Sequence, residues 1–232
     1  MKVTVLAGLA LFLGPMAAVA QVGHAPGDSP FRDIRKGHTL TATAGYFGGS
    51  GGRFNIGPHR GEVFGGRYDI RTASTLQLGL AVARGNLDRF IMDPFVPLAN
   101  RRSGPVRQSV TFAELALQFN LSGGKSWHRI APFVGAGVGL AFASATAADT
   151  SQYEFGRKIY LAPSVGFRFF ITDRLHLRGE ARAAFWKLSY PTTFQLEPPE
   201  EPGTPAVIVG NNLSEWTASP WLQVGLGYSF SP

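Results

Sequence analysis

Charged side chains recur at every second position around residue 180. His176, Arg178, Glu180 and Arg182 alternate with apolar or small residues. In a β-strand this spacing puts all four side chains on one face. Guanidinium and carboxylate groups there could form ion pairs, and the histidine could take part in proton transfer. We favour a polar network, with His176 as a hydrogen-bonded packing residue.

The same alternation continues elsewhere in the chain. Six more polar residues occupy positions of this kind: Arg67, Asp69, Arg71, Glu114, Gln118 and Arg168. The ten side chains include five arginines and three acids, which could neutralise one another if they faced a common interior. The sequence therefore predicts an Arg–carboxylate network inside a β structure.

Other motifs that carry chemistry are absent or incomplete. Gly123-Gly124-Lys125-Ser126 is similar to the end of a phosphate-binding loop, but Phe119 stands where that loop needs its first glycine. No His/Asp/Glu cluster has the spacing of a metal site. We expect no cofactor, no metal and no enzyme activity.

Eight segments alternate in this way, and we predict eight strands. They are residues 38–47, 62–72, 75–84, 108–121, 129–143, 158–171, 174–187 and the closing stretch 221–230. Each is about 10–14 residues long, enough for a tilted strand to cross a bilayer. The connections between them run long, short, long, short, long, short, long, with long ones at roughly 85–106 and 188–219. This predicts an all-β, eight-stranded antiparallel up-and-down barrel with short periplasmic turns and long extracellular loops.

Two barrels fit this alternation. A soluble barrel buries its apolar faces and exposes its polar ones, and a membrane barrel does the reverse. The apolar faces carry almost no charge, and the sorted loops suit a membrane barrel, so we expect the charges to point inward. Trp127, Trp186, Trp216 and Trp221 fall near strand ends, where aromatic side chains meet the membrane interface.

The first 20 residues predict export. They combine Lys2, an apolar stretch and the small residues Ala18-Val19-Ala20, the layout of a cleavable signal peptide. Removing them leaves 21 basic and 15 acidic residues, a net charge of +6. The chain has no cysteine, so disulfides cannot hold it together. We predict a signal peptide at 1–20, a periplasmic lead at 21–37 and the barrel at 38–230.

The closing strand resembles the C-terminal signal of bacterial outer-membrane barrels. Gln223, Gly225, Tyr228 and Phe230 occupy its polar, glycine and aromatic positions, although Ser231 and Pro232 follow the last aromatic. The chain as a whole resembles the small eight-stranded barrels, namely the transmembrane domain of OmpA, OmpX and OmpW. The resemblance implies an outer-membrane location, and assembly with periplasmic chaperones and the barrel-insertion machinery.

A structural and adhesive role, with a plugged lumen and loops presented outside, is the function we expect. A narrow OmpW-like channel for small or apolar solutes is the alternative, through the space left by Gly135, Gly137, Gly139 and Ala141. A lipid A-modifying enzyme is the second alternative, although no histidine is followed by serine two residues later, as in the deacylase type.

We expect outer-membrane lipid and lipopolysaccharide as partners and no nucleic acid. We also expect the chain to be monomeric. The arginines that could contact lipopolysaccharide phosphates are Arg53, Arg60, Arg89, Arg101, Arg102 and Arg107.

Overall fold

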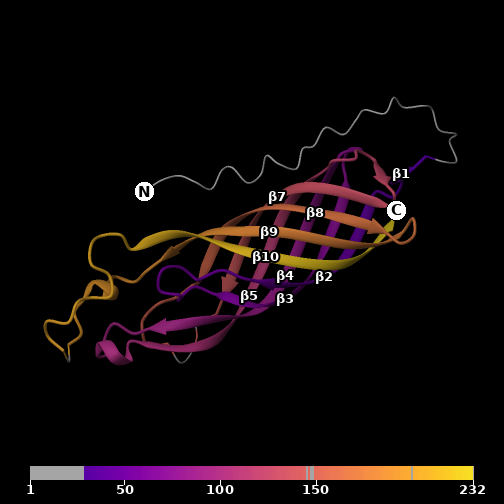
Figure 1. Ribbon diagram of the computed structural model, residues 1–232. Helices are drawn as coiled ribbons and strands as arrows, with labels where there is room; N and C mark the ends of the chain where they lie inside the picture. The colour runs from indigo at the N-terminus through magenta and orange to yellow at the C-terminus, as the bar shows by residue number, and fades with distance from the viewer. Residues whose placement is uncertain (1–28, 145, 147–148, 200, 232) are drawn as a thin grey trace, which may run out of the picture. The chain divides into compact units, whose positions relative to one another are not determined.

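The computed structural model describes residues 29–144, 146, 149–199 and 201–231. The chain divides into two units, residues 1–30 and 31–232, and every strand lies in the second (Figure 1). The predicted signal peptide and residues 21–28 of the predicted lead lie outside the described residues, so these boundaries stay predictions.

Eight long antiparallel strands close into a barrel (Figure 1). Their bounds are β2 (His38–Phe47), β3 (His59–Arg71), β4 (Leu76–Met92), β5 (Arg102–Asn120), β7 (Ile130–Ala143), β8 (Arg157–Phe170), β9 (Leu175–Ser189) and β10 (Ser214–Phe230). Each strand pairs with its neighbour in the chain, and β10 pairs with β2, so that Val224 lies opposite Ala44. The predicted up-and-down barrel is confirmed.

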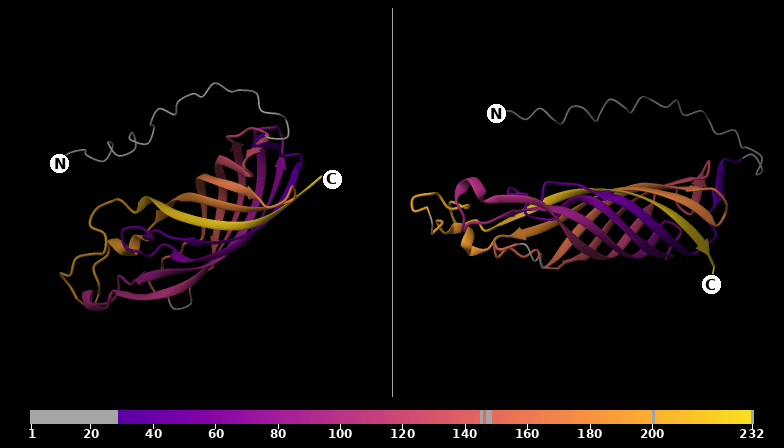
Figure 2. Two further views of the ribbon diagram at one scale, coloured as in Figure 1. Left: turned by 45° about the vertical axis from the view of Figure 1, so that its right-hand side comes forward. Right: turned by 90° about the horizontal axis from the view of Figure 1, so that it is seen from below.

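The register sets the tilt of the strands. A row of directly paired residues leaves β8 at Arg157 and returns to β8 at Phe167, ten residues further along. Between them it passes through Phe142, Thr111, Arg84, Phe64, Ala44, Val224 and Gly179. Such a stagger makes the strands cross the barrel wall obliquely, at about 35–45° to its axis. Both views in Figure 2 show this slant.

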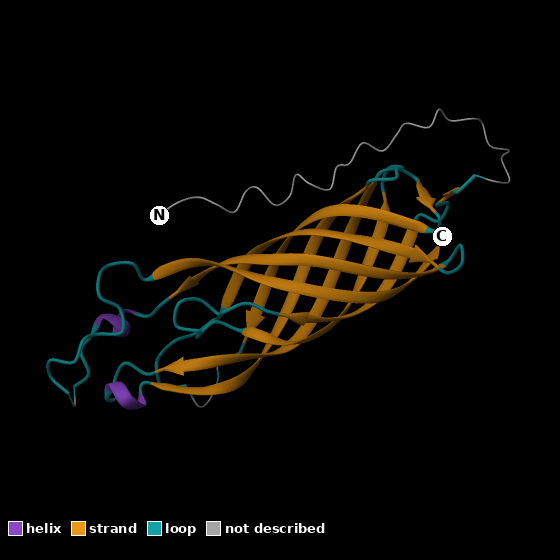
Figure 3. Ribbon diagram, in the orientation of Figure 1, coloured by secondary structure: helices purple, strands orange, loops and turns teal. Residues whose placement is uncertain are grey.

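The longest connections lie at one end of the barrel and the shortest at the other, as predicted, although 121–129 and 93–101 are equally long at nine residues each (Figure 3). Short connections span 72–75, 121–129 and 171–174, and they lie at the turn end of the barrel. Longer connections span 48–58, 93–101, 144–156 and 190–213, and they lie at the loop end. The two ends are called the turn end and the loop end below.

The second long connection was predicted wrongly as residues 85–106. Here β4 continues to Met92 and β5 begins at Arg102, so the hairpin keeps pairing well past the apolar belt. Asn86 and Asp88 look like loop residues in the sequence because they face outward where lipid no longer requires apolar side chains. The backbone ladder continues there because pairing needs no particular side chain.

Short elements complete the structure. At the turn end, β1 (Phe31–Asp33) pairs with β6 (Lys125–Trp127), which lies within the 121–129 connection. Two short 3₁₀ segments, η1 (Leu98–Asn100) and η2 (Thr192–Gln195), lie in the long connections. Within the described residues, no helix has the length and apolar character to cross a membrane.

Candidate functional site

The two faces of the barrel wall have opposite polarity. Leu115 and Phe167 point outward and are 45% and 49% exposed, whereas Arg178 and Glu180 point inward and are 3% and 5% exposed. A soluble barrel would show the reverse. Since apolar side chains cover the outside and charges fill the inside, the wall suits a hydrocarbon surround.

Two ion pairs lie in the polar half of the interior, towards the turn end. Arg67 Nε lies 2.7 Å from Asp69 Oδ1, and Arg178 Nη2 lies 2.8 Å from Glu180 Oε2. Gln223 donates a further hydrogen bond of 2.8 Å to Glu180 Oε2. These contacts satisfy the buried carboxylates, which would be costly to leave without partners.

A third ion pair joins Arg182 of β9 to Glu114 of β5 through the barrel interior. Tyr160 donates a hydrogen bond of 2.9 Å to the same oxygen of Glu114. The Arg182 guanidinium also lies over the Trp221 ring, 4.7 Å from its centroid. This cluster therefore marks the level at which the interior changes from ionic to aromatic.

Arg168 has no carboxylate partner among the described residues. It donates a hydrogen bond of 2.7 Å to Asn120 Oδ1, which also accepts one of 3.1 Å from Gln118. Its charge lies 5.7 Å from the centroid of Phe170. The pairing of arginines with acids in the interior is thus incomplete.

Two predicted members of the network have other surroundings. His176 is fully buried, with its ring 5.1 Å from that of Phe170, and neither ring nitrogen has a hydrogen-bond partner among the described residues. The ring packs on Phe170, and the expected hydrogen bond is absent among the described residues. Arg71 lies near the turn end and donates to the backbone carbonyls of Ile34 and Arg35 instead of to an acid. It therefore ties the segment before β2 to the barrel.

An aromatic layer fills the loop half of the interior, and sequence reasoning missed it. The Phe47 ring lies 5.6 Å from Phe112, 5.4 Å from Trp186 and 5.7 Å from Trp221. Trp186 and Trp221 are buried, so their predicted interfacial position is wrong, whereas Trp127 and Trp216 are exposed. The available signal was the change from charged to aromatic residues at inward positions towards the loop end of the strands.

The glycines of β7 make room for side chains of neighbouring strands. A Cβ added at Gly137 would meet Glu114, and one added at Gly139 would meet the Tyr160 ring. Glu114 and Tyr160 therefore take up the space beside these two glycines. A cavity of about 20 Å³ remains among residues that include Arg67, Glu114 and Trp221, roughly the room that one water molecule needs.

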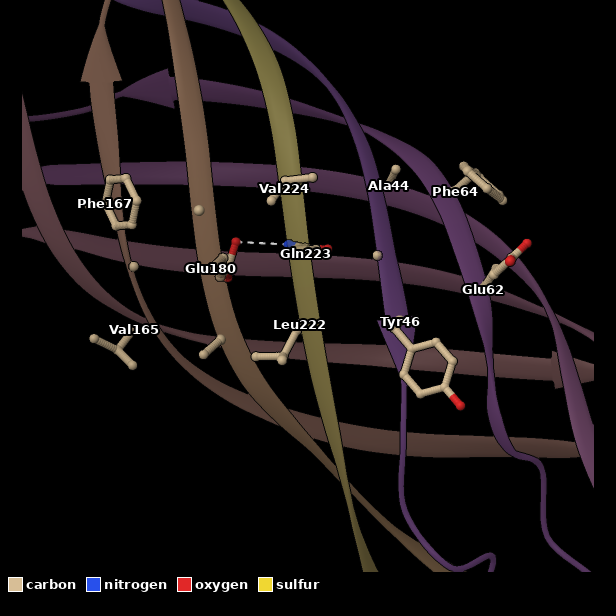
Figure 4. Close-up of a pocket in the computed structure, with 14 residues that line it drawn as sticks. Ala44, Tyr46, Glu62, Phe64, Val165, Phe167, Glu180, Leu222, Gln223 and Val224 are labelled. Carbon is tan, nitrogen blue, oxygen red and sulfur yellow. Dashed lines mark hydrogen bonds between the residues drawn. The ribbon is translucent and has the colours of Figure 1, made fainter.

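A shallow apolar groove crosses the outer wall where β10 meets β2 (Figure 4). Its volume is about 790 Å³, and Phe64, Phe167 and Tyr46 stand around small residues such as Ala44. Glu62 carries an exposed carboxylate at one edge, whereas Glu180 and Gln223, also in the lining, are buried and hydrogen-bonded to each other. The shape suits acyl chains lying against the wall.

The four residues of the predicted insertion signal divide between the faces of β10. Gln223 and Gly225 face the interior, whereas Tyr228 and Phe230 face outward at the turn end. The Phe230 ring lies 5.6 Å from that of His38, on the strand that closes the barrel. Recognition by the insertion machinery stays a prediction.

The predicted loop arginines fall into two groups. Arg89 and Arg101 are buried within the loops: Arg89 pairs with Asp149, and Arg101 donates a hydrogen bond of 2.8 Å to the Pro205 carbonyl. Phosphate contact is therefore unavailable to these two, because their charges hold loops together. Charge counting in a loop cannot distinguish a buried arginine from an exposed one. The other four predicted arginines are exposed, namely Arg53, Arg60, Arg102 and Arg107.

Two tyrosines in the loop region have raised pKa values. Burial raises the pKa of Tyr153, despite the opposing charge of Arg89, whose guanidinium lies 5.5 Å from its ring centroid. Burial and a hydrogen bond to Glu215 raise the pKa of Tyr190. Within the described residues, no group of three or more His, Cys, Asp or Glu side chains could hold a metal ion.

Comparisons with known proteins agree with this geometry at the level of the fold. The structure of Neisserial surface protein A matches with a TM-score of 0.51 and 14% identity, covering 87% of this chain and 98% of that one. The chain has the fold of a small outer-membrane β-barrel. No family model and no curated protein sequence matches it.

Two solved structures from Pseudomonas aeruginosa are also similar. The outer-membrane protein OprG gives a TM-score of 0.46 at 14% identity, covering 88% of this chain and 100% of that one. The N-terminal barrel domain of OprF gives 0.42 at 12% identity, covering 83% and 98%. The closed barrel and the match to Neisserial surface protein A confirm the predicted resemblance to small eight-stranded barrels. The outward apolar wall agrees with the predicted outer-membrane location.

Proposed function

We propose that this chain is a sealed outer-membrane barrel with a structural and adhesive role, which stabilises the membrane and presents a folded loop surface. The observation that carries this proposal is the filling of the interior by two successive layers. The ion pairs of Arg67, Arg178 and Arg182 occupy the turn half, and the aromatic layer around Phe112 and Trp186 occupies the loop half. A barrel of eight strands has little interior beyond what its own side chains fill.

The packing of the long connections supports a presenting role. Ile56, Tyr153, Phe155 and Phe194 come from three of these connections, and all are buried in the same cluster as the aromatic layer. Polar contacts also join separate loops, such as the hydrogen bond of 2.6 Å from Arg53 to the Asn212 carbonyl. A surface that is already ordered loses less conformational entropy when it binds a partner.

Single-channel recording in planar bilayers tests the seal. The wild-type chain should give no steady conductance. The double variant Phe112→Ala/Trp186→Ala should conduct, because it removes the rings that close the loop half. Leu115→Ala/Leu161→Ala, which trims outward side chains, is the matched control and should stay closed. Conductance by the wild type would favour the narrow-channel alternative.

Contact with lipopolysaccharide remains part of this proposal for Arg53, Arg60, Arg102 and Arg107, which are exposed. Arg102→Ala/Arg107→Ala should then weaken retention of lipopolysaccharide by the purified barrel. Arg129→Ala/Arg174→Ala at the turn end removes the same charge and serves as the control.

Absence of catalysis stays a prediction. Lipid A mass spectra from cells with and without the protein should be identical, and a changed acyl pattern would favour the enzyme alternative. Assembly through periplasmic chaperones and the insertion machinery, and a monomeric state, are likewise proposed from the resemblance.

A further inference from the structure

The outer rim of strands β8, β9 and β10 carries two cations and an exposed indole. Lys187 lies directly opposite Trp216 in the β9–β10 ladder. The β8–β9 ladder pairs Tyr160 with Trp186, which puts Ile159 opposite Lys187. Arg157 is two residues from Ile159 and is therefore a diagonal neighbour of Lys187, about 7–8 Å away between backbones. All three side chains are exposed, Trp216 to 66%.

The barrel geometry brings these residues to one depth. A row of paired residues descends ten residues in one circuit of eight strands, which is little more than one residue per strand. Arg157, Lys187 and Trp216 occupy consecutive strands near their loop ends, so they lie at nearly the same height. Directly below them the wall is apolar, with Ile159 and Leu161 68% and 53% exposed.

The patch has the charge of an anion site. Neither Arg157 nor Lys187 has an ion pair among the described residues, and no carboxylate occupies an outward position of β8, β9 or β10. The outward face of β3–β5 differs, since Glu62 and Asp88 stand there beside arginines. Two unpaired cations at the edge of an apolar belt lie where the phosphates of a membrane lipid would be.

We infer that Arg157, Lys187 and Trp216 form a binding site for a phosphorylated glycolipid of the surrounding membrane. The guanidinium and ammonium groups bind its phosphate, Arg157 through paired N–H donors. The flat indole of Trp216 packs against a sugar ring, and the acyl chains run down the wall over Ile159 and Leu161. The inference rests on the barrel spanning an outer membrane and is independent of whether the lumen is sealed.

Native mass spectrometry of the purified full chain in detergent tests this site, with bisphosphorylated lipid A as the probe. Arg157→Ala/Lys187→Ala should weaken lipid A binding by about tenfold or more, because two charge-assisted contacts are lost. Trp216→Ala should weaken it as well. Arg129→Ala/Arg174→Ala, which removes equal charge at the turn end, should bind like the wild type. A heat-modifiability gel checks that each variant is folded.

Two further probes separate the possible ligands. Dephosphorylated lipid A should bind the wild type no better than it binds the double variant. Phosphatidylglycerol should bind the wild type less tightly than lipid A does, and Trp216→Ala should not change its binding. Equal lipid A binding by the wild type and the double variant overturns the site. Equal binding of phosphatidylglycerol and lipid A overturns its glycolipid specificity. If the lumen were not sealed, the conductance measurement would show it, and lipid A binding would be unchanged.

Discussion

Tyr160 donates its hydroxyl to Glu114 Oε2 at 2.9 Å, although 46 residues separate the two in the sequence. The phenol belongs to the aromatic layer, and the carboxylate belongs to the ionic layer. This hydrogen bond therefore joins the two halves of the barrel interior. Loss of Glu114 should affect both halves at once.

Glu114→Gln should destabilise the barrel by about 3–5 kcal/mol, because Arg182 would stay buried without its ion-pair partner. Urea unfolding in lipid vesicles measures the change in the free energy of unfolding. Asp88→Asn is the control, since its partner Arg107 is 75% exposed and lies 3.7 Å away, and such a pair contributes about 1 kcal/mol or less. Equal effects of the two substitutions would contradict the buried pair.

Leu80→Arg should cost about 2–4 kcal/mol of stability, because it turns a charge towards hydrocarbon. Leu80 is 59% exposed on the wall, and Leu98 is 62% exposed in a loop. Leu98→Arg should therefore be nearly neutral, although the chemical change is the same. If both variants unfolded in vesicles like the wild type, the membrane orientation of the wall would be wrong.

Alkaline pH should weaken the loop region through Tyr153. Burial raises its pKa above the ordinary value of 10.0. The folded state thus keeps a proton that the unfolded state loses above that pH. Its stabilising contribution is complete below pH 10 and decreases as the pH rises towards the folded pKa.

Tyr153→Phe should make stability less dependent on pH in this alkaline range, with a small effect at neutral pH because the hydroxyl has no hydrogen-bond partner in the described structure. Unfolding midpoints measured from pH 8 to 11 provide the test. A variant with the same alkaline slope as the wild type would exclude this tyrosine as the cause.

Tyr228→Ala/Phe230→Ala should slow insertion and folding, because it removes both outward aromatics of the closing strand at the turn end. Band shifts on a heat-modifiability gel, followed over time with added insertion machinery, measure the folded fraction. Val224→Ala/Leu226→Ala lies on the same face of β10 and is the matched control. If both double variants folded at one rate, the aromatic residues would have no special role as a signal.

The sequence alone determined the eight strands, their inward and outward faces and the end of the barrel at which the longest connections lie. These properties depend on local periodicity, since a side chain at every second position faces the same way whatever strand lies beside it. The sequence also predicted that the apolar face points outward, because lipid excludes charges such as those of Arg178 and Glu180 from the outer face. The sequence did not predict where β4 ends and β5 begins, because pairing continues past the apolar belt.

Only the tertiary structure decided what fills the interior and which loop charges are available. Arg182 pairs with Glu114 68 residues away, Arg89 pairs with Asp149 60 residues away, and Phe47 packs on Trp186 past the intervening strand β10. Such partners are set by register and strand tilt, which depend on every strand at once. A pattern within one strand can specify a face, but it cannot specify the side chain that meets it from the opposite wall.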